Sequence, residues 1–99
     1  MAKVSNSEAN AVLNALLKQH SAAIAAGYSE PKLVMDSDSE YADVCISWEE
    51  GPYEWPYTFP HGGIDPEFGF AVKDVSDMIP TGIWCETIYG WGLIGIYRD

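Results

Sequence analysis

Apolar residues recur every three or four positions near the start of the chain, which predicts an amphipathic helix over residues 5–27. Ser5 followed by Glu8 fits a capping box, in which the two residues satisfy each other's backbone N–H groups. Gly27 can adopt the left-handed conformation that commonly ends a helix. A helix of about 21 residues would be roughly 30 Å long, so we expect it to lie along a whole sheet face. The apolar stripe consists of Ala9, Val12, Leu13, Leu16, Leu17 and Ile24.

Period-two alternation and short apolar runs predict β-strands in the rest of the chain. The strand segments form two pairs of neighbours, 32–36 with 41–50 and 83–89 with 93–97. The polar loop 36–40 joins the first pair, and a Gly-rich turn makes the second pair a β-hairpin. Both sides of the hairpin are apolar, so we expect it to supply central strands. One helical turn is expected within 73–79.

Four aromatic residues alternate with other residues between the two strand pairs. They are Tyr53, Trp55, Tyr57 and Phe59. An extended segment would put all four rings on one face, and Pro56 restricts that segment to an edge strand or an extended loop. The rings either cover a small core or remain exposed as anchors for a partner. Trp91 poses the same alternative, because the tip of a tight hairpin is normally polar and exposed.

Length and composition indicate one folded domain over residues 1–99. The chain has 99 residues and is 47% hydrophobic, which is too apolar for a disordered segment of low hydrophobicity. We therefore expect an α+β domain with one long N-terminal helix packed on a sheet. The sheet is expected to be largely antiparallel, to have four to five strands and to end in the β-hairpin.

The charge balance excludes several classes of partner. Acidic residues number 15 and basic residues 5, so the formal charge is −10. Nucleic acid and anionic lipid would repel such a chain, so direct nucleic-acid binding and membrane binding are not expected. The N-terminus lacks the apolar stretch of a secretory signal, and no apolar run is long enough to span a membrane. These features predict a cytoplasmic protein.

The acidic residues are concentrated in the middle of the chain. Between Lys32 and Lys73 lie forty residues without a single Lys or Arg. This span could be a solvated surface, a docking surface for a basic protein, or a mimic of nucleic acid. Mimicry would need acidic segments side by side, because one strand carries a charge every 6.6 Å or so, against about 1.7 Å in duplex DNA. The span contains Asp36, Asp38, Glu40, Asp43, Glu49, Glu50, Glu54, Asp65 and Glu67.

Metal binding and catalysis have little support in the sequence. Residues 36–40 open like a calcium loop, but Tyr41 and Ser47 occupy the positions where an EF-hand needs Gly and Glu. No short-spaced pair of zinc ligands is present. Cys45 and Cys85 are interpreted as reduced core residues, with a single bridge between their strands as the alternative. Glu49 and Glu50 would point to opposite faces of a strand. No catalytic residue, metal or cofactor is therefore assigned, and the protein is not expected to be an enzyme.

Short motifs in the C-terminal half resemble small uncharacterised acidic proteins encoded by bacteriophages of actinobacteria. The motifs are the run Trp48–Trp55, Trp84-Cys85-Glu86 and the closing segment Leu93–Asp99. The resemblance implies an accessory protein made in an infected bacterial cytoplasm. Small acidic phage proteins of this kind often bind and block a host protein. The resemblance supplies no catalytic residues.

The charge pattern and the resemblance together predict a non-enzymatic protein-binding module that inhibits or redirects a host protein with a basic surface. The alternatives are a nucleic-acid mimic that blocks a DNA-binding enzyme or defence complex, and a virion or assembly component. A monomer or a small homo-oligomer is expected. The predicted partner-binding residues are Asp36, Asp38, Glu40, Asp43, Glu49, Glu50, Tyr53, Glu54, Trp55, Tyr57 and Trp91.

Overall fold

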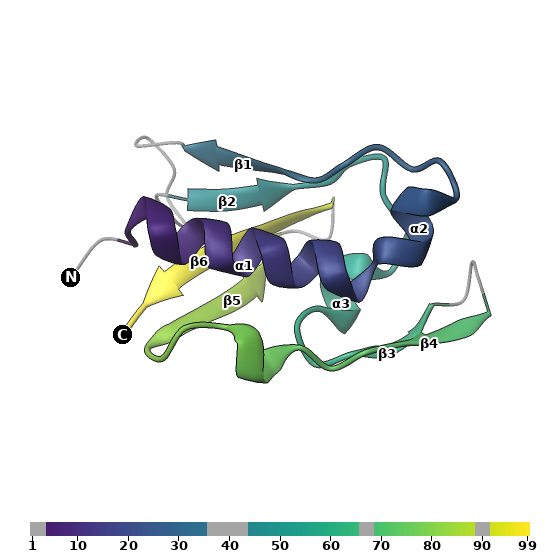
Figure 1. Ribbon diagram of the computed structural model, residues 1–99. Coiled ribbons are helices and arrows are strands. Elements are labelled where there is room, and N and C mark those ends of the chain that lie inside the picture. Colours follow the sequence, from purple (N-terminus) through teal and green to yellow (C-terminus); the bar gives the residue numbers. More distant parts are fainter. Residues whose placement is uncertain (1–3, 36–43, 66–68, 89–91) are drawn as a thin grey trace.

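A helix packed on an antiparallel sheet forms the body of the molecule (Figure 1). The computed structural model describes residues 4–35, 44–65, 69–88 and 92–99. The predicted α+β class, with its N-terminal helix and C-terminal hairpin, is confirmed. Helix α1 (Asn6–Gln19) covers a sheet of order β1-β2-β6-β5, formed by β1 (Lys32–Met35), β2 (Val44–Ser47), β6 (Leu93–Arg98) and β5 (Ile83–Thr87).

Helix α1 begins as the sequence predicts but ends early. The Ser5 hydroxyl accepts a hydrogen bond from the Glu8 N–H, and the Glu8 carboxylate accepts one from the Ser5 N–H, which completes the capping box. The expectation of one continuous helix over 5–27 is wrong, because His20 leaves helical geometry at φ −111° and ψ 29° and interrupts it. A short helix, α2 (Ser21–Ala25), follows. The break places His20 in the core, with its ring 5.5 Å from that of Trp48.

Strand β6 lies in the middle of the sheet, between β2 and β5. The prediction that the hairpin supplies central strands is therefore right for β6 and wrong for β5, which is an edge strand. Strand β2 ends at Ser47, three residues before the predicted end, because a turn closed by the hydrogen bond from the Gly51 N–H to the Trp48 carbonyl follows it. Glu49 and Glu50 thus lie on a turn, and the prediction that they face opposite sides of a strand is wrong.

Part of the proline-rich middle segment is helical where the sequence predicts an extended chain. Helix α3 (Trp55–Thr58) is one turn, with Pro56 in its first positions, where the missing N–H costs no hydrogen bond. A separate two-stranded sheet, β3 (Gly63–Asp65) with β4 (Phe70–Val72), is not among the predicted elements. The expected turn within 73–79 is confirmed as the 3₁₀ helix η1 (Ser76–Met78).

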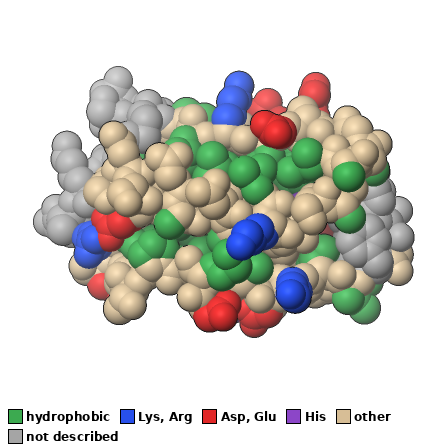
Figure 2. Space-filling model, viewed as in Figure 1, with side chains coloured by type: hydrophobic (Ala, Val, Ile, Leu, Met, Phe, Trp, Pro, Cys, Tyr) green, Lys and Arg blue, Asp and Glu red, His purple; other side chains and the backbone are tan. Residues whose placement is uncertain are grey.

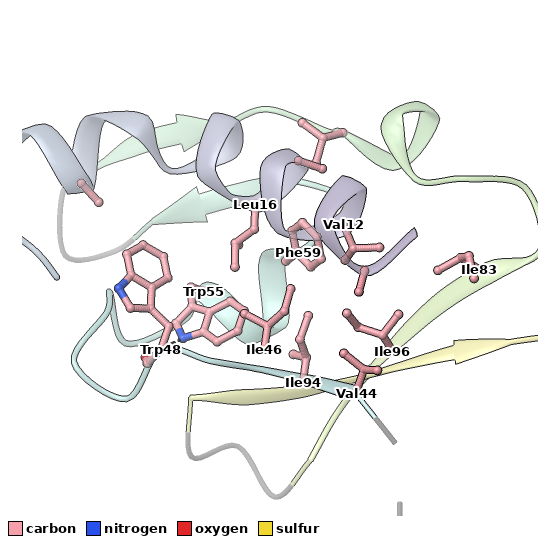
Figure 3. Packing of buried hydrophobic residues seen from close by; sticks show 14 residues of the cluster. Val12, Leu16, Val44, Ile46, Trp48, Trp55, Phe59, Ile83, Ile94 and Ile96 are labelled. Carbon is pink, nitrogen blue, oxygen red and sulfur yellow. Dashed lines mark hydrogen bonds between the residues drawn. The ribbon is translucent and has the colours of Figure 1, made fainter. Parts of the chain in front are cut away.

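The main core fills the space between α1 and the facing side of the sheet. In Figure 3 the indole rings of Trp48 and Trp55 lie at one end of this cluster and Ile83 at the other. Directly paired residues on neighbouring strands point to the same face, so Val44, Ile96 and Cys85 share the helix-covered side. The fully buried members include Val12, Leu16, Val44, Ile46, Trp55, Ile94 and Ile96.

Candidate functional site

Trp48 fixes one end of the molecule by joining three segments. Its indole N–H donates to the Ser29 carbonyl, and its own carbonyl accepts the indole N–H of Trp55 at 3.1 Å. Its backbone N–H donates to the Gly92 carbonyl at 2.7 Å. The two indole rings lie 5.7 Å apart between centroids, and the Trp48 side chain is 2% exposed. The connections α2–β1 and β2–α3 are therefore held against each other by a buried side chain.

An acidic groove opens between these two connections. We define the acidic groove by Ser29, Glu30, Lys32, Glu49 and Glu50, which line a hollow of about 370 Å³ together with Ser47 and Trp48. A smaller hollow of about 290 Å³ adjoins it along residues 26–29 and Glu50. The groove brings three exposed carboxylates and one ammonium group together. Its net negative charge favours a cationic partner.

The aromatic segment presents two of its rings to solvent and buries the other two. Tyr53 is 80% exposed and Tyr57 is 64% exposed, whereas Trp55 is 1% and Phe59 6% exposed. Each of these pairs is separated by four positions, which is the spacing of neighbours on a helix rather than on a strand. The expectation of four rings on one face is therefore wrong. We call Tyr53 and Tyr57 the tyrosine pair.

The predicted partner-binding residues differ in where they lie and in whether they are exposed. Glu49 and Glu50 line the acidic groove, and the tyrosine pair is exposed. The prediction that Trp55 anchors a partner does not fit the structure. Its ring is buried against Trp48, and its indole N–H donates to the Trp48 carbonyl. Glu54 is half-buried at the N-cap of α3. The remaining predicted residues, Asp36, Asp38, Glu40, Asp43 and Trp91, lie outside the described residues, as does the loop compared with a calcium site.

Acidic residues do not form one continuous patch on the face that carries α1. Figure 2 shows that acidic side chains lie towards the margins of this face, with Lys and Arg side chains between them. Among the described residues, the acidic side chains that lie close together are those of Glu30, Glu49 and Glu50, which line the groove. Sequence reasoning misses Glu30, because it precedes Lys32 and reaches the groove only through the contact between Trp48 and Ser29.

The two cysteines lie on opposite faces of the sheet and are not joined by a disulfide. This excludes the alternative of a bridge between their strands. Burial raises the pKa of the Cys85 thiol to about 12, so the nucleophilic thiolate is scarce at neutral pH. His61 lies on an exposed loop beside Asp74, whose pKa is lowered mainly by hydrogen bonds from Ser76 and slightly by the His61 charge. Cys85 therefore lacks the lowered pKa of an activated nucleophile.

Within the described ranges, no three His, Cys, Asp or Glu side chains are grouped so that they could hold a metal ion. The helices in the same part of the chain are all too short or too polar to cross a lipid bilayer. No family model, no curated protein and no solved structure matches this chain. The comparisons therefore supply no function for this chain.

Proposed function

We propose that this protein is a non-enzymatic binding module that docks on a basic surface of another protein. The observation that carries the proposal is the tyrosine pair, two large rings held 80% and 64% exposed on the segment that follows the acidic groove. Exposed tyrosines are common anchors in protein interfaces, because each buries a large amphipathic area at a low cost in side-chain entropy.

The tyrosine pair is held by a rigid support. Trp55 and Phe59, which alternate with the tyrosines, are buried in the main core, and the Thr58 hydroxyl donates to the Trp55 carbonyl at 3.1 Å. The Trp55 indole N–H is bonded to Trp48. A backbone that is ordered before binding loses little further entropy when a partner docks, which favours affinity.

The acidic residues near the tyrosine pair indicate that the partner has a basic surface. Glu30, Glu49 and Glu50 lie in or beside the connection that leads to the tyrosine pair, and no Lys or Arg occurs between Lys32 and Lys73. Complementary charge speeds the encounter with a basic patch and suppresses other partners. This steering is screened over about 8–10 Å at ordinary ionic strength, so binding should weaken as salt is added.

The proposed setting is the cytoplasm of a bacterium infected by a phage that encodes the protein. The support for this setting is the resemblance of the C-terminal motifs to actinobacterial phage proteins. Under this proposal the partner is a host protein, and docking inhibits or redirects it. Mimicry of nucleic acid is an alternative that makes its own prediction, since DNA would then compete with this protein for the same partner.

The proposal predicts that Tyr53→Ala together with Tyr57→Ala abolishes capture of a basic protein from host lysate without unfolding the domain. The captured partner would then be purified and titrated by calorimetry at two salt concentrations. Loss of two anchoring tyrosines should weaken binding at least about tenfold, and higher salt should weaken the wild type further.

Met78→Ala is the matched control, since Met78 is another exposed large apolar residue, 38% exposed, on η1. It should bind as the wild type does. The proposal is wrong if the double variant captures the same proteins with the same affinity, or if no partner with a basic surface is recovered at either salt concentration. Competition by duplex DNA for the purified partner would favour the mimicry alternative.

A further inference from the structure

The face of the sheet that points away from α1 carries an aromatic pair at its β5 edge. Trp84 on β5 and Tyr97 on β6 are directly opposite each other, and their rings are stacked with centroids 4.3 Å apart and planes at 18°. Trp84 is 43% exposed. One side of its indole thus contacts Tyr97, and a large part of the ring remains in water.

Gly95 makes this stacking possible. A Cβ at Gly95 would lie 2.8 Å from the Tyr97 hydroxyl oxygen and 2.9 Å from ring atom Cε2, so the Tyr97 ring lies flat over the glycine backbone. Tyr97 also packs with Leu93 against the buried side chains of Cys45 and Ile88, which form a second apolar cluster. Tyr97 is therefore packed on the sheet, and its ring offers a supported face on which Trp84 stacks.

A carboxylate lies beside the pair on the same face. Glu86 is two positions after Trp84 on β5, so both side chains leave the strand on the same side, and Glu86 is exposed. Burial and the Glu86 charge both raise the pKa of Tyr97, which places this carboxylate within electrostatic reach of the phenol. Of the described residues that the strand register places on this face, Lys32 is the basic one. It lies on β1, at the opposite edge of the sheet from Glu86.

We propose that this face receives an arginine side chain from a partner protein, with the guanidinium stacked on the outer side of the Trp84 indole and paired with the Glu86 carboxylate. A planar guanidinium satisfies both groups at once, because it stacks on aromatic rings and bonds carboxylates with two parallel N–H groups. The compact ammonium of a lysine cannot stack in this way. An uncharged apolar partner would bury Glu86 without a counter-charge, which is unfavourable.

A second copy of this chain does not fit the site. Its charge of −10 would repel an identical molecule, and the described arginine, Arg98, is already paired with Glu8. The site is formed by β5 and β6 and contains no residue of the tyrosine pair, so it can be tested independently of the proposed function. It gives the protein a second point at which a basic chain can be recognised.

The probe for this site is the peptide acetyl-Gly-Arg-Gly-amide, compared with acetyl-Gly-Lys-Gly-amide, each titrated into the ¹⁵N-labelled protein. With the arginine peptide we expect saturable shifts of the Trp84 indole N–H and of the Glu86 and Gly95 amides. We expect the lysine peptide to bind about two- to fivefold more weakly. Glu86→Gln, which changes an exposed side chain, should weaken the arginine peptide by a similar factor.

Trp84→Leu keeps an apolar side chain but removes the aromatic face, and it should also weaken the arginine peptide about two- to fivefold. The Tyr53→Ala/Tyr57→Ala variant should bind the peptide as the wild type does, which separates this site from the tyrosine pair. Shifts centred on other residues, equal affinity for the two peptides, or unchanged affinity in Glu86→Gln would each overturn the proposal. Unchanged amide spectra of the variants away from β5 and β6 would establish that they are folded.

Discussion

Gly51 is required because its neighbour Trp48 leaves no room for a methyl group. A Cβ at this position would lie 2.7 Å from both Cγ and Cε2 of the Trp48 indole. The indole itself is fixed by its bond to Ser29 and by its contact with Trp55, so it cannot move aside without opening the end of the core. We predict that Gly51→Ala lowers the free energy of unfolding by about 1–3 kcal/mol, as measured by urea denaturation.

Gly27→Ala is the informative comparison for Gly51→Ala. Gly27 has a φ of +115°, but no atom lies within 4 Å of the position that a Cβ would take there, so its substitution tests backbone strain alone. This variant should lose about 1–2 kcal/mol and should keep the tryptophan fluorescence of the wild type. Gly51→Ala should shift that fluorescence, because it displaces Trp48. A Gly51→Ala variant with wild-type stability and emission would contradict the packing argument.

At the scale of elements, Gln19 joins three parts of the fold. Its buried amide donates to the Thr58 carbonyl of α3 at 3.1 Å and to the Lys73 carbonyl after β4 at 2.9 Å. Gln19→Glu would remove both donors and set a carboxylate against two carbonyl oxygens. We predict a loss of about 3 kcal/mol or more in the free energy of unfolding at pH 7, measured by urea denaturation.

The Gln19→Glu deficit should shrink as the pH falls towards about 4, because protonation restores a neutral side chain with one donor. Gln19→Met has a similar volume and no charge, so it should lose only about 1–3 kcal/mol, with no such dependence on pH. Equal losses in the two variants at pH 7 would show that the donors, rather than the charge, account for the effect.

The sequence predicts elements well where local signals decide them and poorly where distant contacts do. Ser5 and Glu8 identify the start of α1, and alternation and short apolar runs identify β1, β2, β5 and β6, because these signals are local; β3 and β4 are not predicted. The His20 ring, at the break, packs edge-on against Trp48, which is 28 positions away, and such a contact has no local signal in the sequence. The Tyr53–Phe59 alternation fits a strand or one helical turn equally well, and burial of Trp55 and Phe59 decides for the helix.

In the candidate site too, residues marked by local sequence signals are predicted, and residues placed by distant contacts are not. Glu49, Glu50 and the tyrosine pair can be predicted, because acidic and aromatic residues are dense in that segment. Glu30 and the buried position of Trp55 cannot, because both depend on the bonds that Trp48 makes to Ser29 and Trp55. In the sequence Trp84 is simply part of an apolar strand, since its exposure depends on its lying on the face of the sheet that points away from α1.

For the molecule as a whole, the half-buried thiol of Cys85 on β5 makes stability fall at alkaline pH. The pKa of Cys85 is raised to about 12 by burial, whereas a thiol in an unfolded chain titrates near pH 8.5 or so. Between these values the unfolded state releases a proton that the folded state retains. The free energy of unfolding should therefore fall as pH rises, by at most about 1.4 kcal/mol per pH unit.

Cys85→Val removes this titration while keeping a side chain of similar size that suits a strand. From pH 8.5 to 10 the wild type should lose up to about 2 kcal/mol more than the variant in urea denaturation. Above pH 10 the raised pKa of Tyr97 adds a second loss that both proteins share. Parallel pH profiles for the two proteins below pH 10 would contradict the assignment to Cys85.

Figure 1 shows the start of α1 and the C-terminus at one end of the molecule and α2 at the other. The ion pair between Arg98 and Glu8 ties the last strand to the first turn of α1 there, while the acidic groove opens beside α2. A biotin or a fused reporter attached at Asp99 would therefore project away from the groove. Immobilised in this orientation on a sensor chip, the protein would present the groove to whatever flows past.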